Sequence, residues 1–400
     1  MDSFSPPTPT PKRRSLAGNL FVIFITRSLL STAYRAPYPF LPFITRDLGL
    51  SLEAAGGLIT FRNLIGLSAP LFGPLSDRYG RVTVMAAGLL LVIIGCLTIG
   101  ITYSIILLAL ALATVTVGKT LYDPAQQAYL GDRVPYAERG RALALSELSW
   151  SSAGLIGLPL AGALITLAGW RSPFLIIAVL SVGALVLTWR ALERVSPPGS
   201  PTHTHLTWRA RGQLLSANPT ALAALSTSFL MAAGNENINV VYSTWANRLF
   251  NLDAAALGLI AGAIGLAEFV GELASSVLVD RLGKKRTVLG GLVLTALAAV
   301  GLPFLDQSEW AVAIGLFAMF LAFEFALVSS LPLITELVPQ ARATFISFNV
   351  AAFLLARAVG AFTGSFVFAR FGFIANGLVS AGFTLLGVFV WQAFVREHHT

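Results

Sequence analysis

Long apolar runs separated by short polar turns dominate the chain from residue 17 to residue 395. The clearest of them, VTVMAAGLLLVIIGCLTIGI (82–101) and PFLIIAVLSVGALVLTW (173–189), contain no charged residue. A helix needs about 20 apolar residues to cross about 30 Å of hydrocarbon. Strands of a membrane barrel would instead alternate apolar and polar positions over about 10 residues. The pattern therefore predicts transmembrane helices.

We predict two groups of membrane-spanning helices with one long polar interruption, VSPPGSPTHTHLTWRARGQ (195–213), between them. The predicted spans are 17–40, 53–75, 82–102, 104–130, 143–168, 173–194, 219–246, 254–278, 287–305, 309–335, 344–368 and 372–395. The predicted organisation is a tail (1–16), a six-helix bundle (17–194), a linker (195–218), a second six-helix bundle (219–395) and a short tail (396–400).

Composition supports the membrane prediction and adds an orientation. Hydrophobic residues make up 56% of the chain and charged residues 12%, against about 25% charged in soluble domains. The side holding both predicted termini carries 18 of the 27 Lys and Arg residues, and the other side carries 4. Because basic loops stay inside, we expect a multi-pass protein of the cell membrane with both tails and the linker cytoplasmic. The net charge of +8 then reflects this asymmetry and not nucleic-acid binding.

The chain contains an internal repeat at about half its length. The segment GPLSDRYGR (73–81) returns as SVLVDRLGK (276–284), 203 positions later. A second echo pairs LGDRVP (130–135) with ITELVP (334–339) at an offset of 204. A period of this length indicates duplication of a whole bundle.

These repeated turns resemble the signature of the major facilitator superfamily, G-x-x-x-D-R-x-G-R-[RK], which lies between helices two and three. The weaker family copy lies between helices eight and nine, where the second segment stands. The resemblance covers essentially the whole chain. It implies an all-α membrane protein of twelve transmembrane helices in two pseudo-symmetric six-helix bundles that transports by alternating access.

The charged turns are candidates for a conformational latch. Arg81 can reach Asp132 at the end of the fourth span, and glycines in the turn permit close helix approach. The resemblance implies that such networks hold the two halves together while the cytoplasmic side is shut; the alternative is a topology signal with solvated charges. The candidate latch residues are Gly73, Asp77, Arg78, Gly80, Arg81, Asp132, Asp280, Arg281, Gly283, Lys284 and Glu336.

The fifth span contains AGLIGLPLAGA (153–163), which resembles a degenerate antiporter signature of the same family, G-x-x-x-G-P-x-x-G-G. Leu158 and Ala163 replace two of its glycines. The resemblance favours antiport, and hence efflux, while ordinary small-residue helix packing is the alternative. The matching positions, which we expect to pack closely against another helix, are Gly154, Pro159 and Gly162.

Charged and amide side chains inside the spans are candidates for the transport site. A charge in a span costs a few kcal/mol, so it is normally functional or paired. The family's cavity is lined by helices one, four, seven and ten. GNENINVVYSTW (234–245) is a candidate unwound segment with two asparagines on one face, and three prolines in YRAPYPFLP (34–42) predict a bend. The candidate cavity residues are Arg27, Arg35, Arg62, Lys119, Asn235, Asn239 and Arg357.

Glu324 is the leading candidate for proton coupling, with Asp123 and Glu236 as alternates. It lies in the middle of the span segment MFLAFEFALVS (319–329). Without a partner in hydrocarbon, such a carboxyl is protonated near neutral pH, because desolvation disfavours its charged form. The alternative is a structural ion pair. Asp123 lies four residues after Lys119, and mutual neutralisation is the alternative there.

Glu268 and Glu272 in the eighth span form a second acidic pair. They stand four residues apart on one helix face. Two like charges in lipid need a base or a shared proton. The family's eighth helix usually supports the cavity without lining it.

No catalytic constellation, phosphate-binding loop or metal-ligand spacing occurs in the sequence, so we predict a transporter that is not an enzyme and has no cofactor. The predicted function is export of a small organic solute against protons or another coupling ion, by a monomer in the lipid bilayer. Two alternatives stay open. One is ion-coupled uptake of an organic anion, and the other is a membrane sensor or assembly protein that does not transport.

Overall fold

The computed structural model of the chain describes residues 16–134, 136–193, 218–337 and 342–395. Within these ranges the regular structure is entirely helical. The elements are α1 (Leu16–Arg35), α2 (Pro37–Leu48), α3 (Leu52–Gly66), α4 (Ala69–Tyr79), α5 (Arg81–Ile101), α6 (Ile105–Arg133), α7 (Tyr136–Ser152), the π-helix η1 (Ala153–Gly157), α8 (Leu158–Ala168), α9 (Ser172–Ala191), α11 (Pro219–Asn239), α12 (Tyr242–Phe250), α13 (Ala254–Leu282), α14 (Lys284–Gly301), the 3₁₀-helix η2 (Leu302–Phe304), α15 (Glu309–Glu336) and α16 (Arg342–Phe394).

Together these helices make twelve passes across the described part of the molecule. Eight helices are long and apolar enough to cross a membrane by length and composition. The last of them, within α16, contains two passes joined at Gly372, whose φ of 77° is a left-handed conformation. The predicted all-helical membrane fold is confirmed for the described residues. Most of the two tails and of the linker lies outside these residues.

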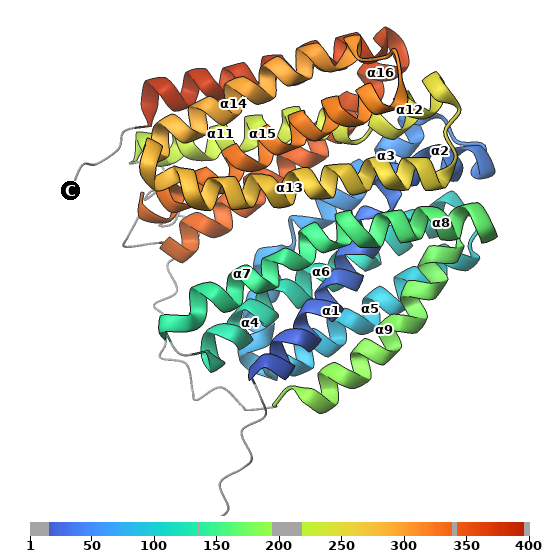
Figure 1. Cartoon of the computed structure of the whole chain (residues 1–400). Coiled ribbons are helices and arrows are strands. Elements are labelled where there is room, and N and C mark those ends of the chain that lie inside the picture. Colours follow the sequence, from blue (N-terminus) through green and yellow to red (C-terminus); the bar gives the residue numbers. More distant parts are fainter. Residues whose placement is uncertain (1–15, 135, 194–217, 338–341, 396–400) are drawn as a thin grey trace, which may run out of the picture.

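The passes form two halves, each with its own hydrophobic core. In Figure 1, α1 and α4–α9 lie in the lower part and α11–α16 in the upper part. One core cluster joins residues of α1, α5, α6 and α9 and extends to Ala254 and Ala261 of α13 in the other half. Another joins α11, α14, α15 and α16. A third cluster lies mainly in the second half but includes Tyr38 and Ile59 of the first. The halves therefore share apolar contacts where these two residues lie.

Three predicted spans are broken helices. The first was predicted as one helix over 17–40, but α1 ends at Arg35 and α2 runs from Pro37 to Leu48. Prolines 37 and 39 cannot donate the backbone hydrogen bonds that would carry a helix through this point. The second span breaks between α3 and α4, and the seventh between α11 and α12, where Val240 and Val241 form a two-residue turn.

The fifth span contains one turn of π-helix, η1, which ends at Gly157, two residues before Pro159. The backbone N–H of Leu158 donates to the carbonyl of Ala153, five residues earlier. Pro159 has no N–H and so leaves a carbonyl of the preceding turn without its usual donor. The wider π-turn accommodates this change in hydrogen bonding. Single π-turns within α-helices are frequent at functional sites.

The two repeated charged turns adopt the same backbone conformation. Gly80 has φ 88° and ψ 145°, and Gly283 has φ 86° and ψ 138°. A side chain would strain this left-handed geometry, which explains glycine at both positions. Both turns, the end of α9 and the start of α11 lie at one end of the molecule, at the left of Figure 1. We call this the linker end, and the opposite one the far end.

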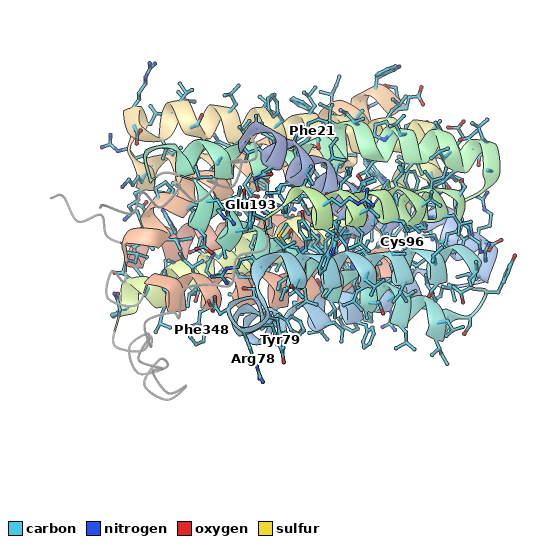
Figure 2. The ribbon with its side chains drawn as sticks, turned by 90° about the horizontal axis from the view of Figure 1, so that it is seen from below. Phe21, Arg78, Tyr79, Cys96, Glu193 and Phe348 are labelled. Carbon is cyan, nitrogen blue, oxygen red and sulfur yellow. The ribbon has the colours of Figure 1, made fainter. Side chains whose placement is uncertain are left out.

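The outer surface between the two ends is apolar. Many large hydrophobic side chains there are exposed, including Leu90, Ile94 and Leu297. Arg78 and Tyr79 point away from the bundle at the first charged turn (Figure 2). An apolar belt between two ends that carry charged side chains is the surface that a bilayer requires.

Candidate transport site

A cavity of about 810 Å³ lies between the two halves. Its lining comes from α1, α2, α7, α8, α11, α12, α13, α15 and α16. Leu145, Ser276 and Leu331, which line it near the linker end, are exposed side chains. The volume lies within the range of about 300–1,000 Å³ that is typical of small-molecule sites.

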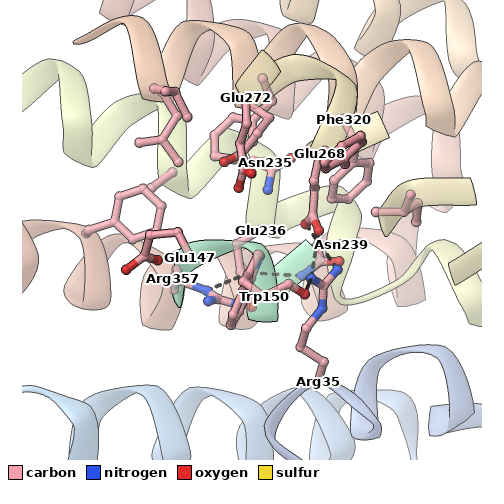
Figure 3. A pocket seen from close by; sticks show the side chains of 18 of the residues that line it. Arg35, Glu147, Trp150, Asn235, Glu236, Asn239, Glu268, Glu272, Phe320 and Arg357 are labelled. Atoms are coloured by element: carbon pink, nitrogen blue, oxygen red, sulfur yellow. Dashed lines mark hydrogen bonds and ion pairs between the residues drawn. The ribbon is translucent and has the colours of Figure 1, made fainter. Parts of the chain in front are cut away.

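An ion pair between Arg35 and Glu268 joins the two halves at the far-end side of the cavity (Figure 3). The two guanidinium nitrogens of Arg35 donate to the two carboxylate oxygens at 2.6 and 3.0 Å. Both residues are buried, at 8% and 6% exposure. The guanidinium also lies 4.6 Å from the ring of Trp150. A bidentate, buried pair of this kind fixes geometry as well as charge.

A second group, made by Tyr38, Glu236 and Arg357, crosses the halves beside the first. Arg357 donates to the Glu236 carboxylate at 3.0 Å and to the Tyr38 hydroxyl at 2.8 Å. The Tyr38 hydroxyl in turn donates to Glu236, and Asn239 donates to the same carboxylate at 3.2 Å. The break at Ala36 places Tyr38 in α2, where its backbone carbonyl accepts from Ser243 at 2.6 Å.

Glycine contacts close the far end further. A methyl group on Gly265 of α13 would lie 2.4 Å from the backbone nitrogen of Leu155 and 2.5 Å from the carbonyl carbon of Gly154. A methyl group on Gly162 would lie 2.4 Å from the carbonyl oxygen of Ala254. The fifth span therefore packs backbone to backbone on α13. Among the described residues, the small side chains of the degenerate signature lie at the contact between the halves.

The cavity wall is rich in carboxyl groups. Of the charged side chains that line it in the described structure, five are glutamates (Glu147, Glu236, Glu268, Glu272 and Glu324) and two are arginines (Arg35 and Arg357). Glu268 pairs with Arg35, Glu236 pairs with Arg357, and Glu147 pairs with Arg27 behind the wall at 2.9 Å. The other two acids, Glu272 and Glu324, form no ion pair with a described side chain. Glu272 accepts from the Ser151 hydroxyl at 3.3 Å.

Glu324 is buried, at 8% exposure, and makes no hydrogen bond or ion pair with any described residue. The Cβ of Glu324 lies 3.0 Å from the position that a methyl group on Gly271 of α13 would take. Glu324 therefore faces the helix that carries Glu268 and Glu272. Two amides of the lining, Asn235 and Asn349, also have a buried oxygen without a hydrogen-bond partner. The cavity thus offers polar groups that the protein itself does not satisfy.

The structure brings only some of the predicted cavity residues together. Those that line the cavity are Arg35, Asn235, Asn239 and Arg357. Arg27 and Lys119 lie behind its wall in the first half, where Lys119 binds Asp123 at 2.6 Å and Arg27 binds the same carboxylate at 3.3 Å. This arrangement matches the predicted alternative of mutual neutralisation.

Arg62 is also absent from the cavity lining. It is 1% exposed and donates to the carbonyl of Tyr34 at 2.7 Å. Its guanidinium lies 4.1 Å from the ring of Tyr34 and 5.0 Å from that of Tyr38. The charge is therefore held by aromatic faces and a carbonyl between α1, α2 and α3.

The first charged turn forms a network within the first half. Arg81 donates to Asp132 at 3.1 Å and to the hydroxyl of Ser76 at 2.7 Å, and it also pairs with Asp77. The network joins α4, α5 and α6, and the side chain of Asp132 is 54% exposed. Gly73 lies in α4. In the second half, Glu336 is the last residue of α15, and its side chain is not among those that the structure describes.

Sequence reasoning assigned no role to several residues that line the cavity or close it. Tyr38 and Trp150 are single aromatics among many, and their partners Glu236 and Arg35 stand 198 and 115 residues away. Asn349 lies in an unremarkable polar position near the start of α16. Glu268 and Glu272 carried a signal, since like charges four apart in an apolar span require a partner.

Comparison with known proteins agrees with this architecture. The sequence profile of the Major Facilitator Superfamily matches residues 23–232 and 224–400. The chain belongs to the Major Facilitator Superfamily. The resemblance seen in the charged turns is thereby confirmed, together with the twelve-helix fold class that it implied. Members of this superfamily are transporters, so the prediction of a transporter and not an enzyme is confirmed as well.

Curated relatives cover nearly the whole chain at low identity. The uncharacterized MFS-type transporter YwfA of Bacillus subtilis is 26% identical over 364 residues, which are 90% of this chain and 88% of YwfA. The purine ribonucleoside efflux pump NepI of Salmonella paratyphi B is 26% identical over 382 residues, 94% of each chain. The crystal structure of a D-xylose-proton symporter superimposes with a TM-score of 0.79 at 17% identity, covering 96% of this chain and 98% of the symporter.

Proposed function

We propose that this superfamily transporter exports a small organic solute across the cell membrane in exchange for protons, by alternating access of the central cavity. The observation that carries the proposal is a buried carboxyl, Glu324, which pairs with no described side chain and lines a cavity that ion pairs seal at one end only. The similarity to an efflux pump over 94% of the chain supports the direction. The cavity described here is lined by a single chain, and we propose that the monomer is the transporting unit.

The distribution of basic residues supports the orientation. The linker end carries the Lys- and Arg-rich turns, and basic loops stay on the cytoplasmic side. With the linker end cytoplasmic, the structure is open to the cytoplasm and closed outside by Arg35–Glu268 and the Tyr38 group. A cytoplasmic solute would enter this state, and the two groups would separate when the outside opens.

Among the three coupling candidates, Glu324 has the geometry of a proton carrier. Asp123 is held by Lys119 and Arg27, and Glu236 is held by Arg357 and Tyr38. Nearby cations and hydrogen-bond donors stabilise the charged form of a carboxyl group, so such a group binds a proton less readily. Glu324 has none among the described residues, lines the cavity and lies on the tenth pass.

Luminal pH tests the proposal. The purified protein is reconstituted in proteoliposomes that contain a pH-sensitive dye, and solutes are added outside. A panel found by thermal-shift screening is used, with inosine included as a purine ribonucleoside. Antiport makes the lumen more alkaline, because solute entering drives protons out. Acidification would indicate symport, and an unchanged pH for every solute that binds would indicate a protein that does not transport.

The latch is tested by Asp77→Asn. We expect transport at least about tenfold slower with solute affinity unchanged, because the amide removes the charge that holds Arg81 at the first turn while the cavity lies elsewhere. Initial rates in proteoliposomes and equilibrium binding measure the two effects. Asp306→Asn, an exposed acid at the far end, is the matched control. A wild-type rate in Asp77→Asn would reject the latch.

A further inference from the structure

The carboxyl groups of the cavity outnumber its cations, and the excess is localised. Each cavity arginine is already used by Glu268 or Glu236. Glu147 is held from behind by Arg27. Among the described side chains, the acids left without a cation are Glu272 on α13 and Glu324 on α15. Glu324 faces α13 at Gly271, the residue before Glu272. Glu272 and Glu324 therefore form a patch of two carboxyl groups in the cavity. A negative charge that is buried without a positive partner costs free energy.

We propose that the solute is an organic cation with an apolar body, whose positive group lies between Glu272 and Glu324. The proposal rests on the proposed transport function and names the substrate class of its site. An anion would meet two unpaired carboxylates at this place, and both arginines would have to leave buried partners to reach it. A cation brings the positive charge that Glu272 and Glu324 do not receive from the described part of the protein.

The rest of the lining fits the apolar body. Phe320, Phe323 and Phe353 line the cavity on α15 and α16, beside Leu327 and Leu354. Aromatic rings attract a cation through their faces and also bury apolar area. The buried amide oxygens of Asn235 and Asn349, which have no hydrogen-bond partner among the described residues, provide acceptors around the same space. A volume of about 810 Å³ accommodates a body of two or more rings.

The same two carboxyls connect the cation to proton exchange. Protonation of Glu272 and Glu324 removes their attraction for a cation, so protons and cation exclude each other. The other charged groups that the structure describes around them are in ion pairs already. Helix α14, which packs on α15, carries its basic residues in its first turn at the linker end. The paired groups are Arg27, Arg35, Glu147, Glu236, Glu268 and Arg357.

Three probes with a similar two-ring body separate charge from shape. N-methyl-phenylpyridinium is the cation, biphenyl carboxylate the anion and biphenyl methanol the neutral compound. Binding of the radiolabelled cation to the purified full chain is measured by scintillation proximity, and the other two are tested as competitors. We expect the cation to bind at least about tenfold more tightly than either. We also expect its affinity to fall as the pH is lowered.

Variants locate the charge. Glu324→Gln and Glu272→Gln should each weaken binding of the cation about tenfold, and the affinity of each should change less with pH than that of the wild type. Glu309→Gln, an exposed acid on the same helix as Glu324, is the control and should bind like the wild type. Thermal unfolding of each variant verifies that it is folded, and Glu324→Asp, which keeps the charge, should bind more tightly than Glu324→Gln.

The outcomes separate this proposal from the proposed function. Preference for the anion or the neutral compound, or unchanged cation affinity in both variants, overturns the cation class. If inosine still makes the proteoliposome lumen alkaline in that case, proton-coupled export stands with another solute. Conversely, cation binding that depends on Glu272 and Glu324, without any luminal pH change, keeps the site and rejects export.

Discussion

Replacement of Glu324 by Gln is expected to abolish solute accumulation driven by a proton gradient while exchange of solute down its own gradient continues. The amide keeps the shape of the protonated acid but cannot release a proton. For electroneutral exchange of one proton per solute, a gradient of one pH unit supports at most about tenfold accumulation, because about 1.4 kcal/mol corresponds to a factor of ten. The expected accumulation ratio in the variant is about one.

Both fluxes should be measured in the same proteoliposomes at two pH values, with solute concentrations raised to offset weaker binding. Glu309→Gln provides a control at an exposed position of α15. Accumulation at the wild-type level in Glu324→Gln would place the proton on another group and leave Glu324 a structural role. Loss of both fluxes with normal thermal unfolding would show that the residue is required for the movement itself.

Gly265→Ala is expected to open the far end and to slow transport. The added methyl group would lie 2.4 Å from a backbone nitrogen of the facing span, so α13 and η1 cannot keep their contact. Overpacking of this kind costs about 1–3 kcal/mol, which shifts the balance between two states about 5- to 150-fold. The state with the far end closed, in which Gly265 packs on Gly154 and Leu155, carries the whole penalty.

Distances between spin labels at Tyr103→Cys and Trp310→Cys report this opening, because the two exposed residues lie at the far end on different halves. The native Cys96 is fully buried and should not be labelled. Gly183→Ala is the control, since a methyl group there meets nothing within 4 Å. We expect longer distances in Gly265→Ala only. Distances and exchange rates like those of the wild type would mean that the contact is not needed for closure.

Much of the fold could be predicted because its determinants are local. The length and apolar character of each run decide that a span forms, and the repeated turns require glycine at residues 80 and 283 whatever surrounds them. The prolines near residue 37 predicted a bend, although the helix was expected to continue to residue 40 without a break. The break at Ala36 follows from two prolines acting together with the contacts of Tyr38 in the other half.

The site could be predicted less completely because its contacts join residues far apart in the chain. The sequence alone indicated that Glu324 lies deep in a span and that Asp123 and Lys119 share a helix face. It could not show that Arg35 reaches Glu268, 233 residues away, or that Arg62 is enclosed by two tyrosines away from the cavity. Which charges remain unpaired depends on these long-range contacts.

By itself, then, the sequence determined the membrane-spanning character, the duplicated halves and the family, since apolar length, charge at the turns and glycine geometry act within a few residues. Only the tertiary structure decided which acids face the cavity and which are neutralised. Burial makes an isolated charge costly and a paired one tolerable. The pairing of three glutamates with arginines therefore singles out Glu272 and Glu324, and no pattern along the chain contains that information.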